Sequence, residues 1–207
     1  EAKEKFERRE LQAAYDIASS MLNDLMAQRR EGLDRSLRDG RNMLDMAKRL
    51  GAASVTLRDR MQRAEELRSS GRLDEATLLA DEVVSYGRSI VSSEIDRQLT
   101  ELMQRAANAR REGVEVGEAE HMCEQASIAL HRGEQGQAFE MTVSARNSLN
   151  EVLATHHSLK ERLEDGEAMM AEARRGSVDV SEASEAFVHA NMLLRSGKYK
   201  ECRDALD

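Results

Sequence analysis

The chain has 207 residues, of which 40% are hydrophobic, 34% are charged and only 3% are aromatic, and it has neither proline nor tryptophan. This composition is typical of long helices and coiled coils, and the lack of proline lets helices run uninterrupted. The formal net charge of −8 disfavours binding to nucleic acid and to anionic membranes. No apolar run approaches the roughly 18 residues that span a bilayer. We therefore expect an all-α protein with no nucleic-acid partner and no membrane insertion.

The cysteine content and the N-terminus bear on location. Cys123 and Cys202 are the two cysteines, and their spacing predicts neither a disulfide framework nor a metal site. The cysteine content therefore predicts a protein of a reducing compartment. Because the N-terminus has no secretory signal pattern, we expect the protein to be cytoplasmic. The chain begins at Glu1 without a methionine, so we expect it to be a fragment of a longer protein.

The first predicted helix covers residues 9–50. Its apolar residues recur every three or four positions, which is the period of one helix face. Those residues are Leu11, Ala14, Ala18, Met21, Leu22, Leu25, Leu33, Leu37, Leu44 and Ala47. Lys48 and Arg49 close the helix, where the helix dipole favours cations, and Gly51 takes the left-handed position that ends it.

Short and long helices alternate along the rest of the chain. Short helices are predicted after the connection 52–55 up to Gly71, and at about 117–132 and 180–196; long helices are predicted at about 73–112 and 136–175; a last helix begins near Tyr199. Basic pairs precede Gly113 and Gly176, as they precede Gly51, so these glycines are expected to end the long helices. Asp179, with Glu182 three residues later, predicts a capping box at the third short helix.

The layout of a short helix, a glycine turn and a long helix recurs three times. The turn glycines Gly71, Gly133 and Gly197 follow one another at intervals of about 63 residues, which indicates tandem helical repeats. Aligned on these glycines, the short helices match at Leu57, Ala119 and Ala183; Met61, Cys123 and Phe187; Ala64, Ala126 and Ala190; and Leu67, Ala129 and Leu193. The long helices match at Ala14, Ala76, Ala138 and Cys202; Ala18, Ala80 and Thr142; and Met21, Val83 and Ala145.

The difference in helix length predicts how the helices pack. A short helix covers only part of a neighbour more than twice its length, so each long helix is expected to divide between two successive three-helix bundles. The predicted segments are 1–30, the end of a preceding repeat or a linking half-helix; 31–94, the first repeat bundle; 95–157, the second; and 158–207, a truncated third. Together they predict elongated tandem repeats of about 63 residues.

Two families share parts of this pattern. The long–short–long order resembles the spectrin repeat architecture, in which a continuous helix links successive three-helix bundles, although spectrin repeats are much longer and carry a tryptophan that is absent here. The turn from Ser196 to Cys202, SGKYKEC, resembles the G-x-Y-x-x-A turn of tetratricopeptide helices, whose period is about 34 residues. A general similarity to archaeal helical-repeat proteins covers the whole chain and rests on no motif. The spectrin resemblance implies a structural scaffold, and the tetratricopeptide resemblance implies a peptide-binding solenoid.

The sequence contains no pattern for catalysis, for a cofactor or for a metal. It has no phosphate-binding loop, nucleophile elbow or zinc ligand set. In the repeat alignment Cys123 points inward and His121 outward, so the two cannot share a tetrahedral ion. The adjacent His156 and His157 face about 100° apart on a helix. Both cysteines are interpreted as packing residues. We expect no enzyme activity, cofactor, metal or small-molecule substrate.

Two further features have structural explanations. Basic pairs at Arg29-Arg30, Lys48-Arg49, Arg110-Arg111 and Arg174-Arg175 suggest an anion-binding stripe, but three of the four lie at helix C-termini, where the dipole accounts for them. Gly87 occupies the register of Leu25 and Leu149, so it is interpreted as a place where two helices approach closely rather than as part of a phosphate-binding loop.

One surface favours a protein partner. The first half of the helix at 9–50 has the apolar register of the other long helices, yet no short helix precedes it to cover that face. The residues expected to be exposed, and so to form a protein-interaction surface, are Leu11, Tyr15, Met21, Leu22 and Leu25. Either truncation removed a preceding repeat, which is the favoured reading, or this half-helix binds another protein or associates with itself. The sequence thus predicts a non-enzymatic spacer or protein-interaction scaffold, with a peptide-binding solenoid adaptor as the alternative.

Overall fold

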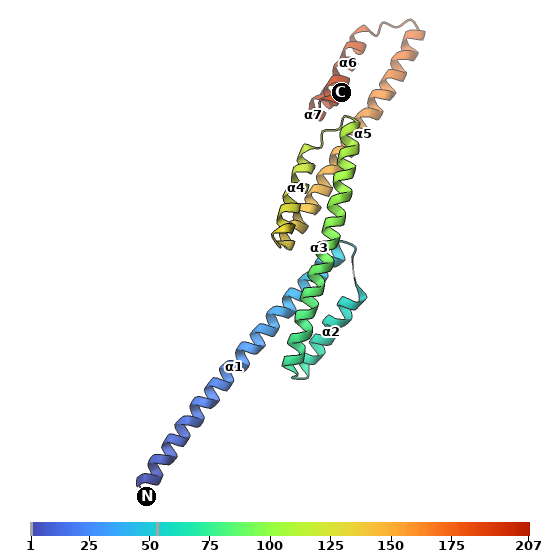
Figure 1. Cartoon of the computed structure of the whole chain (residues 1–207). Coiled ribbons are helices and arrows are strands. Elements are labelled where there is room, and N and C mark those ends of the chain that lie inside the picture. Colours follow the sequence, from blue (N-terminus) through green and yellow to red (C-terminus); the bar gives the residue numbers. More distant parts are fainter. Residues whose placement is uncertain (1, 53) are drawn as a thin grey trace. The chain divides into compact units, whose positions relative to one another are not determined.

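The computed structural model describes residues 2–52 and 54–207, and within these residues it contains helices and no strand. The helices are α1 (Ala2–Arg49), α2 (Val55–Ser69), α3 (Leu73–Arg111), α4 (Gly117–His131), α5 (Gln135–Arg175), α6 (Ser181–Arg195) and α7 (Tyr199–Leu206) (Figure 1). The all-α prediction is confirmed, and the predicted helix bounds agree to within about two residues, except that α1 begins at Ala2 rather than at residue 9. Glu1, in the first predicted segment, and Ala53, in the first predicted connection, lie outside the described residues.

The chain forms two compact units, residues 1–94 and 95–207. Helix α3 is continuous from Leu73 to Arg111 and contributes residues to both units. The division into segments 1–30, 31–94, 95–157 and 158–207 stays a prediction. Each unit is described separately below.

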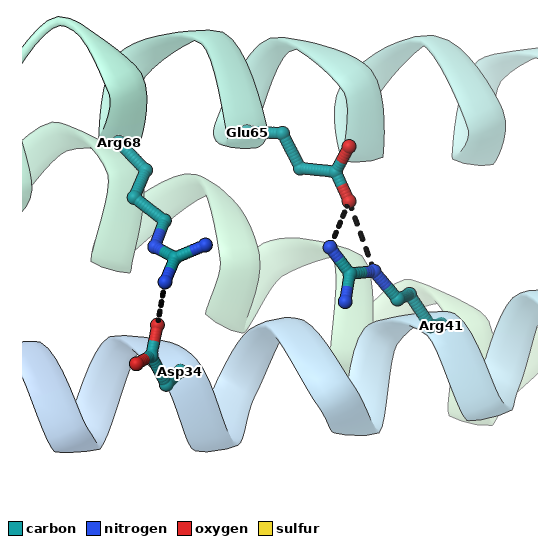
Figure 2. A network of polar contacts seen from close by, with 4 residues as sticks. All are labelled: Asp34, Arg41, Glu65 and Arg68. Atoms are coloured by element: carbon teal, nitrogen blue, oxygen red, sulfur yellow. Dashed lines mark hydrogen bonds and ion pairs between the residues drawn. The ribbon is translucent and has the colours of Figure 1, made fainter.

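In the first unit, the second half of α1, all of α2 and the first half of α3 surround one apolar core. The buried members of this core are Leu33, Leu37, Leu57, Met61, Ala64, Ala76, Ala80 and Val83. Around it, exposed ion pairs join α1 to α2: Arg41 contacts Glu65 at 2.6 Å and Arg68 contacts Asp34 at 2.7 Å (Figure 2). Exposed pairs of this kind contribute little each, so the buried apolar side chains supply most of the packing free energy.

In the second unit, α5 packs against α4 through its first half and against α6 and α7 through its second half. The second half of α3 joins the α4 side, where Arg105 donates to Asn150 of α5 at 2.8 Å and Arg110 pairs with Glu120 of α4. The core on the α6 side consists of Leu159, Leu163, Ala190, Leu193, Leu194 and Cys202.

Small residues permit close helix contacts in the first unit. A Cβ atom placed on Gly87 of α3 would lie 2.7 Å from Cβ of Met43 on α1, which confirms the predicted close approach at this glycine. A Cβ on Gly40 of α1 would lie 3.1 Å from both Sδ of Met61 and Cγ1 of Val83. Glycine on one helix therefore faces larger side chains on the other two.

Six helix ends in the described part of the chain close with the same hydrogen bonds. In each, the residue in the left-handed conformation donates its backbone N–H to the carbonyl oxygen three positions earlier. The residue after it donates its N–H to the carbonyl oxygen five positions earlier, which is the Schellman pattern. Five of the left-handed residues are glycines. The sixth is Ser177, with φ of 60°. Gly176 is the C-cap at which α5 ends, as predicted, but it is not the left-handed residue of this turn. Gly176 has φ of −80°, and Ser177 stands where Gly51 and Gly113 stand in the earlier helices.

The start of α6 also differs from its prediction. The N-cap of α6 is Val180, which has no side-chain cap, so the capping box between Asp179 and Glu182 does not form. Instead Oδ1 of Asp179 accepts from N–H and Oγ of Ser181, at 3.0 and 2.6 Å. The aligned stripe is also incomplete here, because Ala183 is exposed whereas Leu57 and Ala119 are buried.

The strained turn at Ser177 gives a first prediction. A non-glycine residue in the left-handed region costs roughly 1 kcal/mol, so Ser177→Gly should raise the free energy of unfolding by up to about 1 kcal/mol, less the extra chain entropy of glycine. Urea unfolding followed by circular dichroism would measure the change. Gly113→Ser, which creates the same strain at the equivalent turn, should destabilise the protein, and a stabilising Gly113→Ser would contradict the argument.

The core of the second unit gives another prediction. Ala126 of α4 is fully buried, so Ala126→Asp places an unpaired charge in an apolar environment. We expect a loss of about 3 kcal/mol or more in the free energy of unfolding. His121→Asp, at an exposed position of the same helix, is the matched control and should change stability little. Equal thermal midpoints for the two variants would show that position 126 does not face the core.

Candidate functional site

The first half of α1 carries an exposed apolar face. The side chains predicted to lie uncovered are exposed, by 71% for Leu11, 69% for Tyr15, 61% for Met21 and Leu22, and 52% for Leu25. Ile17 and Met26, at 62% and 36%, extend the face, and sequence reasoning missed them because they flank the three-and-four stripe. We call Leu11, Tyr15, Ile17, Met21, Leu22, Leu25 and Met26 the α1 apolar face. Contiguous exposed apolar surface of this kind marks interaction sites in soluble proteins.

Charge is scarce along this part of α1. From Leu11 to Gln28 only Asp16 and Asp24 are charged, in a chain whose overall charged fraction is 34%. Asp16 is engaged locally, because its Oδ1 accepts from Nε2 of Gln12 at 2.8 Å. The cores of protein interfaces are depleted in charged residues. The stretch thus has the composition of an interface core, although it lies on the exposed half of α1.

The equivalent residues on the other long helices are buried. Ala76, Ala80 and Val83 of α3 and Ala138, Thr142 and Ala145 of α5 all have 0% exposure. By contrast, Ala14, Ala18 and Met21 of α1 are exposed. Neighbouring helices therefore cover these aligned positions on α3 and α5, whereas the same positions on α1 are exposed to solvent. Among the described residues, no pair of helices packs on this half of α1.

The second unit contains a half-open hollow of about 680 Å³ between the α3–α4 connection, α5 and α6. Its lining mixes apolar residues such as Val114 and Leu194 with the opposite charges of Glu164, Lys160 and Arg195. These charged side chains are exposed, whereas His156 in the same lining is partly buried.

His156 is a partly buried polar residue of this hollow. Its ring meets the ring of Tyr199 edge-on with centroids 6.0 Å apart, and its Nδ1 is buried without a hydrogen-bond partner. Tyr199 in turn accepts a hydrogen bond on its hydroxyl from N–H of Glu115 at 2.9 Å. Burial lowers the pKa of His156, and the charges of Lys160 and His157 lower it further against the opposing effect of Glu112. His156 thus makes a structural contact between α5 and α7, and its burial there favours the neutral imidazole.

The residues considered for metal binding do not converge. His157 is exposed and pairs with Glu161 at 3.2 Å, whereas its neighbour His156 packs against Tyr199. Cys123 is buried whereas His121 is exposed, in agreement with the prediction that they diverge. Among the described residues no group of three His, Cys, Asp or Glu side chains is placed to hold an ion. Burial raises the pKa of both Cys123 and Cys202, which is the behaviour of packing cysteines.

The basic pairs make contacts within the chain. Arg110 binds Glu120, Arg174 donates to Oγ of Ser184 at 3.2 Å, and Arg29 pairs with Asp74 at 3.2 Å. The pairs at 48–49, 110–111 and 174–175 lie in the last turns of α1, α3 and α5, where the helix dipole favours cations. Helix ends and neighbouring helices thus account for these charges.

Comparison with known proteins adds no relative. Searches of protein-family models, of curated proteins and of solved structures found no match to this chain. None of the described helices has the length and apolarity required to cross a bilayer. The α1 apolar face is the candidate functional site that remains.

The position of His156 predicts a pH dependence of stability. Because its pKa is lowered in the folded protein, the unfolded chain takes up more protons as the pH falls through the ordinary imidazole value of about 6.5. The free energy of unfolding should therefore decrease on acidification in this range, and the loss should level off below the folded pKa. His156→Gln should remove part of that decrease. Urea unfolding at pH 7.5 and 5.5 would measure it, and an identical decrease in both proteins would exclude His156 as a source.

Proposed function

We propose that this protein is a non-enzymatic helical-repeat scaffold that holds a protein partner through the α1 apolar face. One observation carries the proposal: the face has the register that is buried on α3 and α5, yet it is exposed on α1. Leaving these side chains in water forgoes about 25 cal/mol for each Å² of apolar surface. A helical partner that covers the stripe would recover that free energy.

The repeat organisation of the scaffold, which resembles spectrin, has support in the polar contacts. Oγ of Ser36 on α1 donates to Asp81 of α3 at 2.7 Å, and Nη2 of Arg162 on α5 donates to Asp207 at 2.8 Å. Arg162 lies as far after Ser36 in the sequence as Asp207 lies after Asp81, and this separation equals the sum of the two predicted repeat lengths. The same inter-helix position is therefore bridged in the first and the last repeat.

The spacer role depends on an extended shape and is tested by small-angle scattering. A compact globule of 207 residues has a radius of gyration of about 17 Å. A chain of successive three-helix bundles linked by continuous helices should exceed this value well beyond experimental error at low protein concentration. A measured radius equal to that of the compact globule would contradict the spacer proposal.

A further inference from the structure

The second unit contains another hollow, of about 240 Å³, in the groove between the second half of α3 and the first half of α5. Its lining residues are Arg97, Gln98, Glu101, Leu102, Arg105 and Arg146, and we call this set the arginine hollow. Three of the six residues are arginines and one, Glu101, is acidic. The lining therefore carries a net positive charge in a chain whose formal net charge is −8.

The guanidinium groups of Arg105 and Arg146 enter this groove from opposite helices. Arg105 of α3 donates from Nη2 to Oδ1 of Asn150 on α5 at 2.8 Å, and Arg146 of α5 donates from Nη2 to Oε1 of Gln98 on α3. Gln98 lies about two helical turns before Arg105, and Arg146 lies about one turn before Asn150. The two hydrogen bonds therefore cross the groove in neighbouring turns, and both guanidinium groups line one hollow.

The acceptors of these two arginines are neutral amides. Arg97 of the same hollow differs, because it pairs with the carboxylate of Glu101. In the part of the chain that the structure describes, no carboxylate pairs with Arg105 or with Arg146. Two positive charges in one groove without a negative partner repel each other, and an anion placed between them would turn this repulsion into attraction.

Gln98 gives the hollow a fixed wall. Its side chain is only 7% exposed, and Thr142, the other buried polar residue among those described, bonds within its own helix to the carbonyl of Ala138. Buried polar groups need hydrogen-bond partners, and the Oε1 atom of Gln98 accepts from Arg146. The bond that satisfies a buried amide thus also positions a guanidinium group, which reduces the entropy that this side chain would lose on binding a ligand.

The aligned repeats indicate that these two cations are not needed for helix packing. Aligned on the turn glycines, Arg105 corresponds to Met43 and Met169, and Arg146 corresponds to Val84. Apolar side chains therefore occupy the same positions elsewhere in the chain, so the helical framework does not require charge there. The two arginines are specific to the middle of the chain, and a ligand for them accounts for their presence.

We propose that the arginine hollow binds a phosphoryl group, as the free ion or as the monoester of a small molecule. The planar guanidinium group donates paired N–H bonds that match the oxygens of a phosphate. A phosphoryl group offers three acceptor oxygens and nearly two negative charges, which suits the uncompensated charges of Arg105 and Arg146. A carboxylate offers one charge and two oxygens.

The net charge of the chain does not prevent this binding. Exposed charges more than about 10 Å apart are largely screened at 0.1 M salt, so a small anion responds mainly to the arginines that it contacts. The hollow belongs to the second unit and makes no use of the α1 apolar face. The inference is therefore independent of the proposed scaffold function.

Titration of the full chain with inorganic phosphate tests the proposal, with sodium chloride at the same ionic strength as the reference. Calorimetry should detect phosphate binding by the wild type. The thermal midpoint should also rise with phosphate concentration, because a ligand that binds only the folded state stabilises it. Arg105→Gln and Arg146→Gln should each weaken phosphate binding by more than about tenfold, the loss expected for a charge-assisted hydrogen bond.

Two further variants serve as controls. Arg105→Lys keeps the charge but loses the paired donors, so its affinity should lie between those of the wild type and Arg105→Gln. Arg132→Gln removes an exposed arginine of the same unit that does not line the hollow, and it should bind phosphate as the wild type does. Far-ultraviolet circular dichroism in chloride checks that each variant folds.

Phenyl phosphate distinguishes the two sources of the phosphoryl group. Binding of both phenyl phosphate and inorganic phosphate would support the proposal and show that the hollow accepts a monoester. Binding of inorganic phosphate alone would support it with the free ion as the ligand.

Three results would overturn the inference. The first is a wild type that responds to phosphate no more than to chloride. The second is an equal loss of phosphate affinity in Arg132→Gln, which would show a general response to surface charge. The third is full affinity in folded Arg105→Gln and Arg146→Gln, which would place the anion elsewhere on the chain.

Discussion

Helices α3 and α5 each serve two different cores with a single apolar stripe, and the rest of the structure depends on this constraint. Helix α3 is the clearest case, because Ala80 and Val83 lie in the core of the first unit while Leu99 and Leu102 are buried in the second. A break within α3 would remove one wall from each core. The free energies of folding of the two units are therefore coupled through one backbone.

The arrangement of helices could be predicted from the sequence because its signals are local. Proline is absent, apolar residues recur with the helical period, and glycines stand at the turns. The sequence therefore predicts the helix ends to within about two residues, apart from the start of α1. Local structure differed from the expected pattern where two neighbouring residues could fill the same role in a turn or a helix cap. Ser177 rather than Gly176 adopts the left-handed conformation, and Asp179 binds Ser181 instead of capping α6 with Glu182. Backbone geometry, not residue preference, decides between such neighbours.

The candidate site was predictable in part. The uncovered register of α1 follows from comparing the repeats within the chain, and Leu11, Tyr15, Met21, Leu22 and Leu25 are exposed as expected. The exposure of Ala183 on α6 was not predicted, because Ala183 fits the apolar alignment with the buried Leu57 and Ala119. The contact of His156 with Tyr199 was also missed, since it joins residues far apart in the sequence that no shared pattern relates.

The Schellman turns have a consequence for how the chain folds. Every one of these helix ends is closed by bonds between residues no more than five positions apart, so each reversal of direction needs no help from distant segments. The helices they join then meet neighbours that follow directly in the sequence, a topology of low contact order that is associated with fast folding. During synthesis from the N-terminus, each short helix would find the end of the preceding long helix already made. Packing would thus advance along the chain at the pace of translation.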